Sequence, residues 1–177
     1  MNRPLSDVEV ISLCNGLKLG SRIGTNRFSF FTYDDLATQT YPRPNCGYII
    51  LFRENPNFGH FCCLINHNGI LEFFDSYGLK PDRELDWNSA RINRQLCQDK
   101  PYLSRIMRSF PGKLEYNEHH LHGDGEHDQT CGRWCGMRCL LSGMSLLQFV
   151  KVIHYLSKGI HVTPSELITI LSNNVLY

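Results

Sequence analysis

Cys131, His60 and Asp75 are the side chains of this sequence whose types could carry out chemistry together. A cysteine thiol is a nucleophile once it is ionised, an imidazole accepts its proton near neutral pH, and a carboxylate holds the imidazole in one tautomer. After the attack on a carbonyl group, the same imidazole can return the proton to a leaving amine. The three residue types therefore predict acyl transfer through a thioester.

Cys131 is expected at the start of a helix. The polar, glycine-containing segment before it is typical of a loop, and apolar residues recur at helical spacing from Cys131 through Trp134 and Cys139. Asp128 or Thr130 can cap this helix. The dipole and the free backbone N–H groups of a first helical turn favour a thiolate, and the same N–H groups can hold an oxyanion.

The segments around His60 and Asp75 predict neighbouring antiparallel strands. Three apolar runs have the length and composition of strands, over residues 48–52, 60–65 and 70–75. The dipeptide Asn68-Gly69 between the second and the third is a strong signal for a tight hairpin. Such a hairpin brings the start of one strand next to the end of the following strand. We therefore expect His60 and Asp75 to meet at one edge of a sheet.

Helices are predicted on either side of these strands in the sequence. Ser6 and Thr163 are each followed three positions later by Glu, a capping box that marks a helix start. Apolar spacing indicates three further helices, over residues 86–98, 102–110 and 146–157. We expect an α+β fold with a central, mostly antiparallel sheet packed between helices and with Cys131 at the N-terminus of a buried helix. Because repeats and linker-like segments are absent, residues 1–177 are expected to form a single domain.

Composition excludes several classes of protein. Hydrophobic residues make up 42% of the 177 residues and charged residues 20%, as in globular proteins. No apolar run reaches the roughly 18 residues that span a bilayer, and the N-terminus lacks the core of a signal peptide. The eight scattered cysteines are therefore expected to be free thiols in a reducing compartment. With a net charge of +1, binding to nucleic acid by bulk electrostatics is not expected. We also expect no membrane association, and a monomer.

The ordered motifs around the three residues resemble those of the adenovirus-type and ubiquitin-like-protein-specific cysteine proteases. The motifs are Gly59-His60-Phe61, Phe74-Asp75-Ser76-Tyr77-Gly78 and Thr130-Cys131-Gly132-Arg133-Trp134-Cys135. They are most similar to those of the maturation proteases of virophages, polinton-type elements and related large DNA viruses. The resemblance covers roughly residues 60–139. It implies the adenain-like fold, in which the nucleophile starts a buried helix that packs against a central sheet.

This resemblance also implies roles, substrates and a location. Cys131 would be the nucleophile, His60 the general base and acid, and Asp75 the residue that orients His60. Cleavage would occur next to Gly or other small residues, because a narrow channel admits no bulky side chain, and Phe61 and Trp134 are candidates for its walls; core packing is the alternative for Trp134. The substrates would be viral capsid or core precursor proteins, cut during particle maturation in the virion or in the viral factory of the host cytoplasm.

One position departs from the family pattern. The family has a glutamine several residues before the cysteine, and its side-chain amide donates to the oxyanion. In the matching motif, which starts at Tyr116-Asn117, His122 stands where the glutamine is expected. An imidazole N–H can also donate a hydrogen bond to an oxyanion. Gln129, two residues before Cys131, is the second candidate for this role.

Two other functions remain open on the sequence alone. Proteases that remove ubiquitin-like modifiers share this set of motifs. A catalytically inactive or zinc-stabilised binding module is the alternative from another class, because potential zinc ligands gather in one region: His119, His120, His122, His127, Cys131 and Cys135. The spacing of these residues matches no standard zinc motif, so we expect no cofactor and no metal in the catalytic site.

Overall fold

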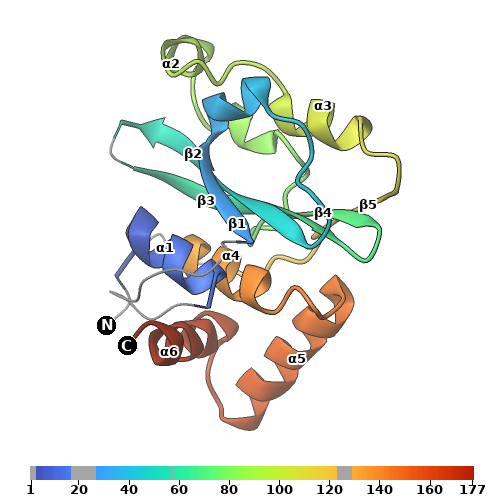
Figure 1. Cartoon of the computed structure of the whole chain (residues 1–177). Helices are drawn as coiled ribbons and strands as arrows, with labels where there is room; N and C mark the ends of the chain where they lie inside the picture. Colours follow the sequence, from blue (N-terminus) through green and yellow to red (C-terminus); the bar gives the residue numbers. More distant parts are fainter. Residues whose placement is uncertain (1–2, 17–26, 57, 123–128) are drawn as a thin grey trace.

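Five strands form one mixed sheet with helices on both of its faces (Figure 1). The computed structural model describes residues 3–16, 27–56, 58–122 and 129–177. The strands lie side by side in chain order, as β1 (Phe28–Thr32), β2 (Cys46–Asn55), β3 (Phe58–His67), β4 (Ile70–Phe74) and β5 (Lys113–Tyr116). The α+β class is therefore confirmed.

The directions of the strands correct the expectation of a mostly antiparallel sheet. The central strands β2, β3 and β4 pair antiparallel, whereas β1 runs parallel to β2 and β5 runs parallel to β4. Each edge strand is separated in the chain from its partner by a long connection that contains helical turns. Such connections allow the chain to cross over and return in the same direction, which a tight hairpin does not.

The predicted hairpin joins β3 to β4. Asn68 and Gly69 have φ angles of 50° and 73°, the left-handed conformation that two-residue hairpins require. The register pairs Cys63 with Phe74. Asp75 follows directly after Phe74, so it lies at the end of β4 that is next to the first half of β3. This pairing brings Asp75 close to His60, as expected.

Two layers of helices cover the sheet (Figure 1). On one face lie α1 (Asp7–Cys14), α4 (Cys131–Leu140), α5 (Leu146–Gly159) and α6 (Pro164–Leu176). On the other face lie the 3₁₀ turns η1 (Tyr33–Thr38) and η2 (Arg83–Asp86) with α2 (Ala90–Gln95) and α3 (Tyr102–Arg108). Each layer has its own apolar core against the sheet. None of the described helices is both long and apolar enough to cross a bilayer.

The predicted helix starts are confirmed where capping boxes mark them. Ser6 caps α1 and Thr163 caps α6, and in each case the Glu three residues later bonds back to the capping residue. The predicted helix over residues 86–98 is corrected to η2 and the shorter α2. Ser89 is the N-cap of α2 and has an extended backbone conformation, so Trp87 and α2 do not form one continuous helix. Trp87, between η2 and α2, is 41% exposed.

Helix α4 is the most deeply buried helix of the fold and packs against β3, α1 and α6. Two glycines on α4 allow α1 to approach closely. A Cβ atom at Gly132 would lie 2.8 Å from Val10 Cγ2, and one at Gly136 would lie 2.4 Å from Leu13 Cδ2. Both distances are shorter than van der Waals contact, so larger residues would push the two helices apart.

A buried ion pair ties the far end of α4 to the sheet. Arg138 donates from Nε and Nη2 to the two carboxylate oxygens of Glu72 on β4, at 2.7 Å each. The ring of His67 contacts the same carboxylate at 2.8 Å. All three side chains are buried. Loss of one partner from such a group leaves an uncompensated charge, so the network strongly favours one position of α4 on the sheet.

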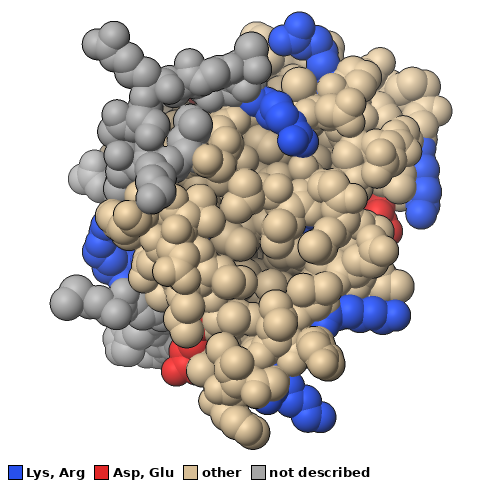
Figure 2. Space-filling view, turned by 60° about the horizontal axis from the view of Figure 1, so that its bottom comes forward, with Lys and Arg blue, Asp and Glu red and all other residues tan. Residues whose placement is uncertain are grey.

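The surface in Figure 2 shows the side of the molecule that carries the lower helices of Figure 1. Lys and Arg side chains occur singly around the rim of this face, and its centre is formed by uncharged residues. Among the described residues of this face, the basic side chains do not gather into a patch.

Candidate active site

His60 and Asp75 form a buried hydrogen-bonded pair at one end of the sheet. The Nε2 atom of His60 lies 2.5 Å from Asp75 Oδ2, and the two residues are 3% and 0% exposed. The second carboxylate oxygen of Asp75 accepts the backbone N–H of Tyr77 at 2.7 Å. The Asn117 side chain donates to the Asp75 backbone carbonyl at 2.6 Å. Asp75 is thus held in place from several sides, and it fixes the orientation of the imidazole.

Cys131 is the first residue of α4, and its thiol hydrogen-bonds to His60. Because Asp75 occupies Nε2 of His60, the remaining ring nitrogen, Nδ1, is the one available to the thiol. Thr130 occupies the N-cap position of α4, and Asp128 lies outside the described residues. The structure therefore brings together the three residues that the sequence singled out for chemistry.

The surroundings of Cys131 favour its thiolate. Burial opposes ionisation, but the hydrogen bond and positive charge of His60 and the backbone N–H groups of Phe61 and Gly132 outweigh it, and the pKa of Cys131 is lowered. For His60, burial opposes the charged form, but the charge and hydrogen bond of Asp75 and the contact with Cys131 raise its pKa well above the usual value. The two shifts together favour a thiolate–imidazolium pair.

A cavity of about 640 Å³ opens in front of this pair. Residues 4–8, at the start of α1, form one wall. The candidate catalytic residues and their neighbours also line the cavity, namely His60, Phe61, His122, Gln129, Cys131 and Gly132. The Cys131 residue therefore borders a space large enough for several residues of an extended peptide. Phe61 lies where the sequence analysis expected a wall of the binding channel.

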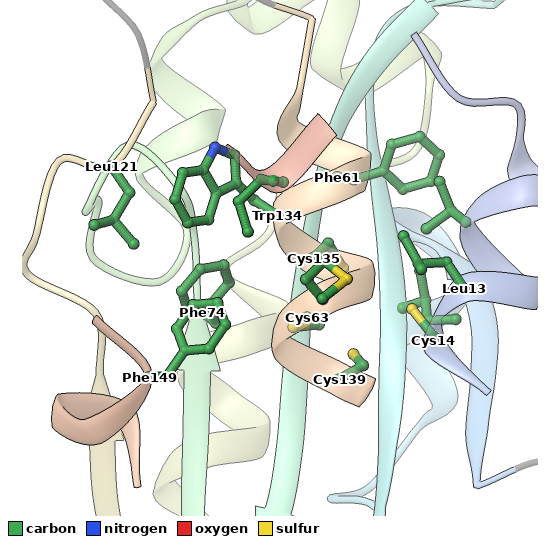
Figure 3. Packing of buried hydrophobic residues seen from close by; sticks show 14 of the residues in the cluster. Leu13, Cys14, Phe61, Cys63, Phe74, Leu121, Trp134, Cys135, Cys139 and Phe149 are labelled. Carbon is green, nitrogen blue, oxygen red and sulfur yellow. The ribbon is translucent and has the colours of Figure 1, made fainter. Parts of the chain in front are cut away.

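Trp134 does not line this cavity, which corrects its assignment as a channel wall. Its side chain is 0% exposed and packs edge-on against Phe149 in the core beneath the sheet (Figure 3). Trp134 lies nearly one turn after Cys131, on a helix that is buried on all sides. Core packing, the alternative considered for this residue, is therefore its role.

Both candidates for the oxyanion donor line the cavity with Cys131. His122 is buried, its ring stacks on Tyr77 with centroids 4.3 Å apart, and its backbone N–H donates to the Ser76 carbonyl at 3.1 Å. Gln129 lies two residues before the thiol and is only partly buried. Of the two residues, His122 is therefore the more deeply buried.

The histidines that suggested a zinc-stabilised module do not form such a site in the described part of the chain. His119, His120 and His122 do not gather with Cys131 and Cys135 into a set of possible ligands. His127, the remaining member of that set, lies outside the described residues.

Two aromatic residues next to His60 complete the site. The rings of Tyr77 and Trp87 lie 5.2 and 5.1 Å from the imidazole, measured between centroids. Both also line the cavity. Tyr77 belongs to a motif that the sequence analysis quoted, whereas Trp87 lies outside the quoted motifs. The two rings shield the imidazole from water, which strengthens its interactions with Asp75 and Cys131.

Glu84 is a second buried carboxyl group close to this pair. It is 1% exposed, and neither side-chain oxygen accepts a hydrogen bond from another described residue. Burial and the negative charge of Asp75 raise the pKa of Glu84 to about 8. Glu84 is therefore largely protonated at neutral pH. Asp75 is then the ionised carboxylate that contacts His60. No motif in the sequence indicated this residue.

Comparison with known proteins gives one informative similarity. A protein of Sputnik virophage with the name "Uncharacterized protein V9" is 34% identical to the chain over 148 residues, which are 83% of this chain and 82% of that protein. No family model matches the chain.

Selective alkylation tests the ionisation of Cys131. We expect iodoacetamide to modify Cys131 at pH 7 roughly ten times faster than an ordinary exposed thiol, because only a few per cent of an ordinary thiol is ionised at this pH. Cys97 is exposed and serves as the internal reference. Peptide mapping by mass spectrometry measures both rates. In His60→Ala the advantage of Cys131 should disappear, and an unchanged rate in that variant would contradict the ion pair.

The pKa of Glu84 predicts a dependence of stability on pH. Its ordinary value is 4.5, and the folded value is about 8. Below pH 4.5 both states are protonated. Between these two values only the unfolded state is ionised, so it binds fewer protons and the free energy of unfolding falls as the pH rises. One such group contributes at most about 1.4 kcal/mol per pH unit.

Glu84→Gln keeps the shape of the protonated carboxyl and removes its titration. Urea unfolding between pH 5 and 8 should therefore show a smaller loss of stability in Glu84→Gln than in the unaltered protein. His60 titrates in both proteins, so the difference between the two curves reports on Glu84. Parallel curves would show that Glu84 is already ionised in the folded state.

Proposed function

We propose that the chain, which belongs to the same family as the protein V9 of Sputnik virophage, is a viral cysteine endopeptidase. The observation that carries the proposal is the position of His60. Its buried imidazole contacts the Asp75 carboxylate on one side and the Cys131 thiol on the other, and the thiol faces a cavity. This order of contacts is the one in which an imidazole activates a nucleophile. The motif resemblance supports the same assignment and, with it, the adenain-like fold.

The reaction begins with the thiolate of Cys131. It attacks the carbonyl carbon of the scissile bond and forms a tetrahedral oxyanion. The imidazolium of His60 then gives its proton to the leaving amine, and a thioester with Cys131 remains. A water molecule attacks the thioester while His60 accepts its proton, which releases the acid product and regenerates the thiol. Asp75 keeps the ring oriented and favours its charged form throughout.

The oxyanion is stabilised by hydrogen-bond donors around Cys131. The backbone N–H groups at the start of α4 point toward the anion and lie at the positive end of the helix dipole. His122 is the first candidate for an additional side-chain donor, because it is buried and held against Tyr77 beside the cavity. Gln129 is the second. In either case the donor replaces the glutamine that the family pattern has at this place.

The shape and surroundings of the cavity support small residues next to the cut. Phe61 and Gly132 lie directly beside the thiol, and a Cβ atom at Gly132 would already lie 3.3 Å from Phe61 Cδ2. Bulky substrate side chains have little space between these two residues. The virophage relative supports a viral context. The motif resemblance extends the proposal to capsid or core precursor proteins, cut next to Gly or another small residue, in the virion or in the viral factory of the host cytoplasm.

The alternatives differ in what they require of Cys131. An inactive binding module needs no ionised thiol, so the lowered pKa of Cys131 argues against it. A protease that removes ubiquitin-like modifiers would use the same site, and only the substrate separates the two enzymes.

Cleavage of precursor proteins tests the proposal. The capsid and core proteins encoded by the same virus are incubated with the unaltered protein, with Cys131→Ala and with Cys46→Ala. Cys46→Ala is the control, because it removes a thiol at the end of β2 that is far from His60. We expect cleavage next to small residues with the first and third proteins and none with Cys131→Ala, because the nucleophile is absent. Mass spectrometry of the new termini identifies the cleavage sites. Within the same assay, His122→Ala should lose more activity than Gln129→Ala.

A fusion of a ubiquitin-like modifier to a reporter is the competing substrate. If only this fusion is cut, the deconjugating alternative replaces the proposal. If Cys131→Ala cleaves as well as the unaltered protein, Cys131 is not the nucleophile.

A further inference from the structure

Four cysteines that play no part in the proposed mechanism converge behind the candidate active site. Cys14 comes from α1, Cys63 from β3, and Cys135 and Cys139 from successive turns of α4. Figure 3 shows their side chains gathered where these three elements meet. All four are buried free thiols. Residues from three separate elements thus present sulfur atoms to one point in the interior.

The distances between these sulfur atoms suit a single metal ion. The sulfurs of Cys14, Cys135 and Cys139 all lie within 4.8 Å of one another. The thiol of Cys63 interacts with those of Cys135 and Cys139, but its sulfur does not lie within 4.8 Å of all three others. A tetrahedral zinc ion with Zn–S bonds of about 2.3 Å requires sulfurs about 3.8 Å apart. The three sulfurs of Cys14, Cys135 and Cys139 are already near this spacing, and coordination by four ligands requires Cys63 to move toward them.

The environment also meets the requirements of a structural site. The four cysteines belong to the apolar core beneath the sheet, and each is at most 2% exposed. Cys14 and Cys139 also line a small cavity of about 80 Å³, together with Arg27 and Leu140. This cavity provides a path by which an ion can enter.

A cation close to the cluster compensates for part of its charge. Four thiolates around one Zn²⁺ carry a net charge of −2. The guanidinium of Arg138 interacts electrostatically with both Cys63 and Cys139. It is fixed there by its two hydrogen bonds to Glu72. Such a group in the second shell stabilises thiolate ligands.

We propose that Cys14, Cys63, Cys135 and Cys139 form a structural site for one Zn²⁺ ion. Coordination replaces the S–H proton of each ligand, so up to four protons are released to solvent and no oxidant or reductant takes part. Soft thiolate ligands in a tetrahedral arrangement select zinc over magnesium or calcium. The sequence analysis expected no metal, and the zinc alternative that it named shares only Cys135 with this site.

Such an ion would join the elements that carry the candidate active site. Cys135 lies one helical turn after Cys131, and Cys63 lies three residues after His60. Cys14 ends α1, whose first turn forms a wall of the cavity. The ion would therefore hold the nucleophile helix, the strand of the base and the cavity wall at constant distances, without contact with the substrate.

Metal content tests this proposal independently of catalysis. All measurements use a Cys131→Ala background, so that zinc bound by the candidate catalytic residues does not contribute and enzymatic activity plays no role. The protein is expressed with added Zn²⁺, purified with its thiols reduced, and analysed by plasma mass spectrometry. We expect about one zinc ion per chain. Replacement of zinc by Co²⁺ should give the intense visible and near-ultraviolet absorption of a tetrahedral thiolate site.

Adjacent cysteines on β3 provide a matched control. Cys63→Ala, Cys14→Ala and Cys139→Ala should each lose zinc, whereas Cys62→Ala should retain it. Cys62 is equally buried but belongs to the core on the opposite face of the sheet. If a ligand variant does not fold, the cobalt spectrum of the parent protein still shows whether cysteine thiolates coordinate the metal.

Three results would overturn the proposal. The first is a parent protein that binds less than a tenth of an equivalent of zinc and gives no cobalt–thiolate band. The second is zinc binding that survives in Cys14→Ala and Cys139→Ala. The third is a disulfide between two of these cysteines in the reduced preparation, found by peptide mapping.

Discussion

The close packing of α4 against β3 and α1 is the constraint on which the candidate site depends. Cys131 can reach His60 only because the first turn of α4 rests directly on β3. Gly132 and Gly136 permit this approach, since a Cβ atom at either would overlap α1. At the other end of the helix, the buried pair of Arg138 and Glu72 holds it on β4. The position of Cys131 is therefore set by contacts along the whole length of the helix.

The electrostatics of the site depend equally on burial. Asp75, His60 and Glu84 lie close together in a region from which water is largely excluded. Two ionised carboxylates there would repel each other, and the raised pKa of Glu84 relieves this repulsion by keeping one of them protonated. The remaining carboxylate is directed at the imidazole, and the imidazole in turn at the thiol. A single negative charge at Asp75 thus supports the charge separation between His60 and Cys131.

Much of this arrangement could be predicted from the sequence, because it depends on local patterns. The Asn68-Gly69 turn determines the register of β3 and β4, and the register places Asp75 beside His60. The change from a polar segment to helical spacing placed Cys131 at a helix start. These signals require only the preferences of adjacent residues.

The features that could not be predicted depend on segments far apart in the chain. Trp87 and Glu84 reach the site because the long connection between β4 and β5 folds back over the sheet, and its path has no local signature. The parallel pairing of β1 and β5 has the same cause. Trp134 was misplaced because α4 is buried on all sides, so periodicity does not distinguish its active-site face from its core face. The proximity of Cys14 on α1 to Cys135 and Cys139 on α4 likewise becomes visible only in three dimensions.

A covalent probe tests most directly whether Cys131 is an activated nucleophile in a peptide-binding cavity. A short peptide that ends in glycine vinyl methyl ester presents an electrophile where the scissile carbonyl would lie. Intact-mass measurement and peptide mapping should show one adduct, located on Cys131, which forms slowly or not at all in His60→Ala. The account would be contradicted if the adduct formed on another cysteine, or at an equal rate without His60.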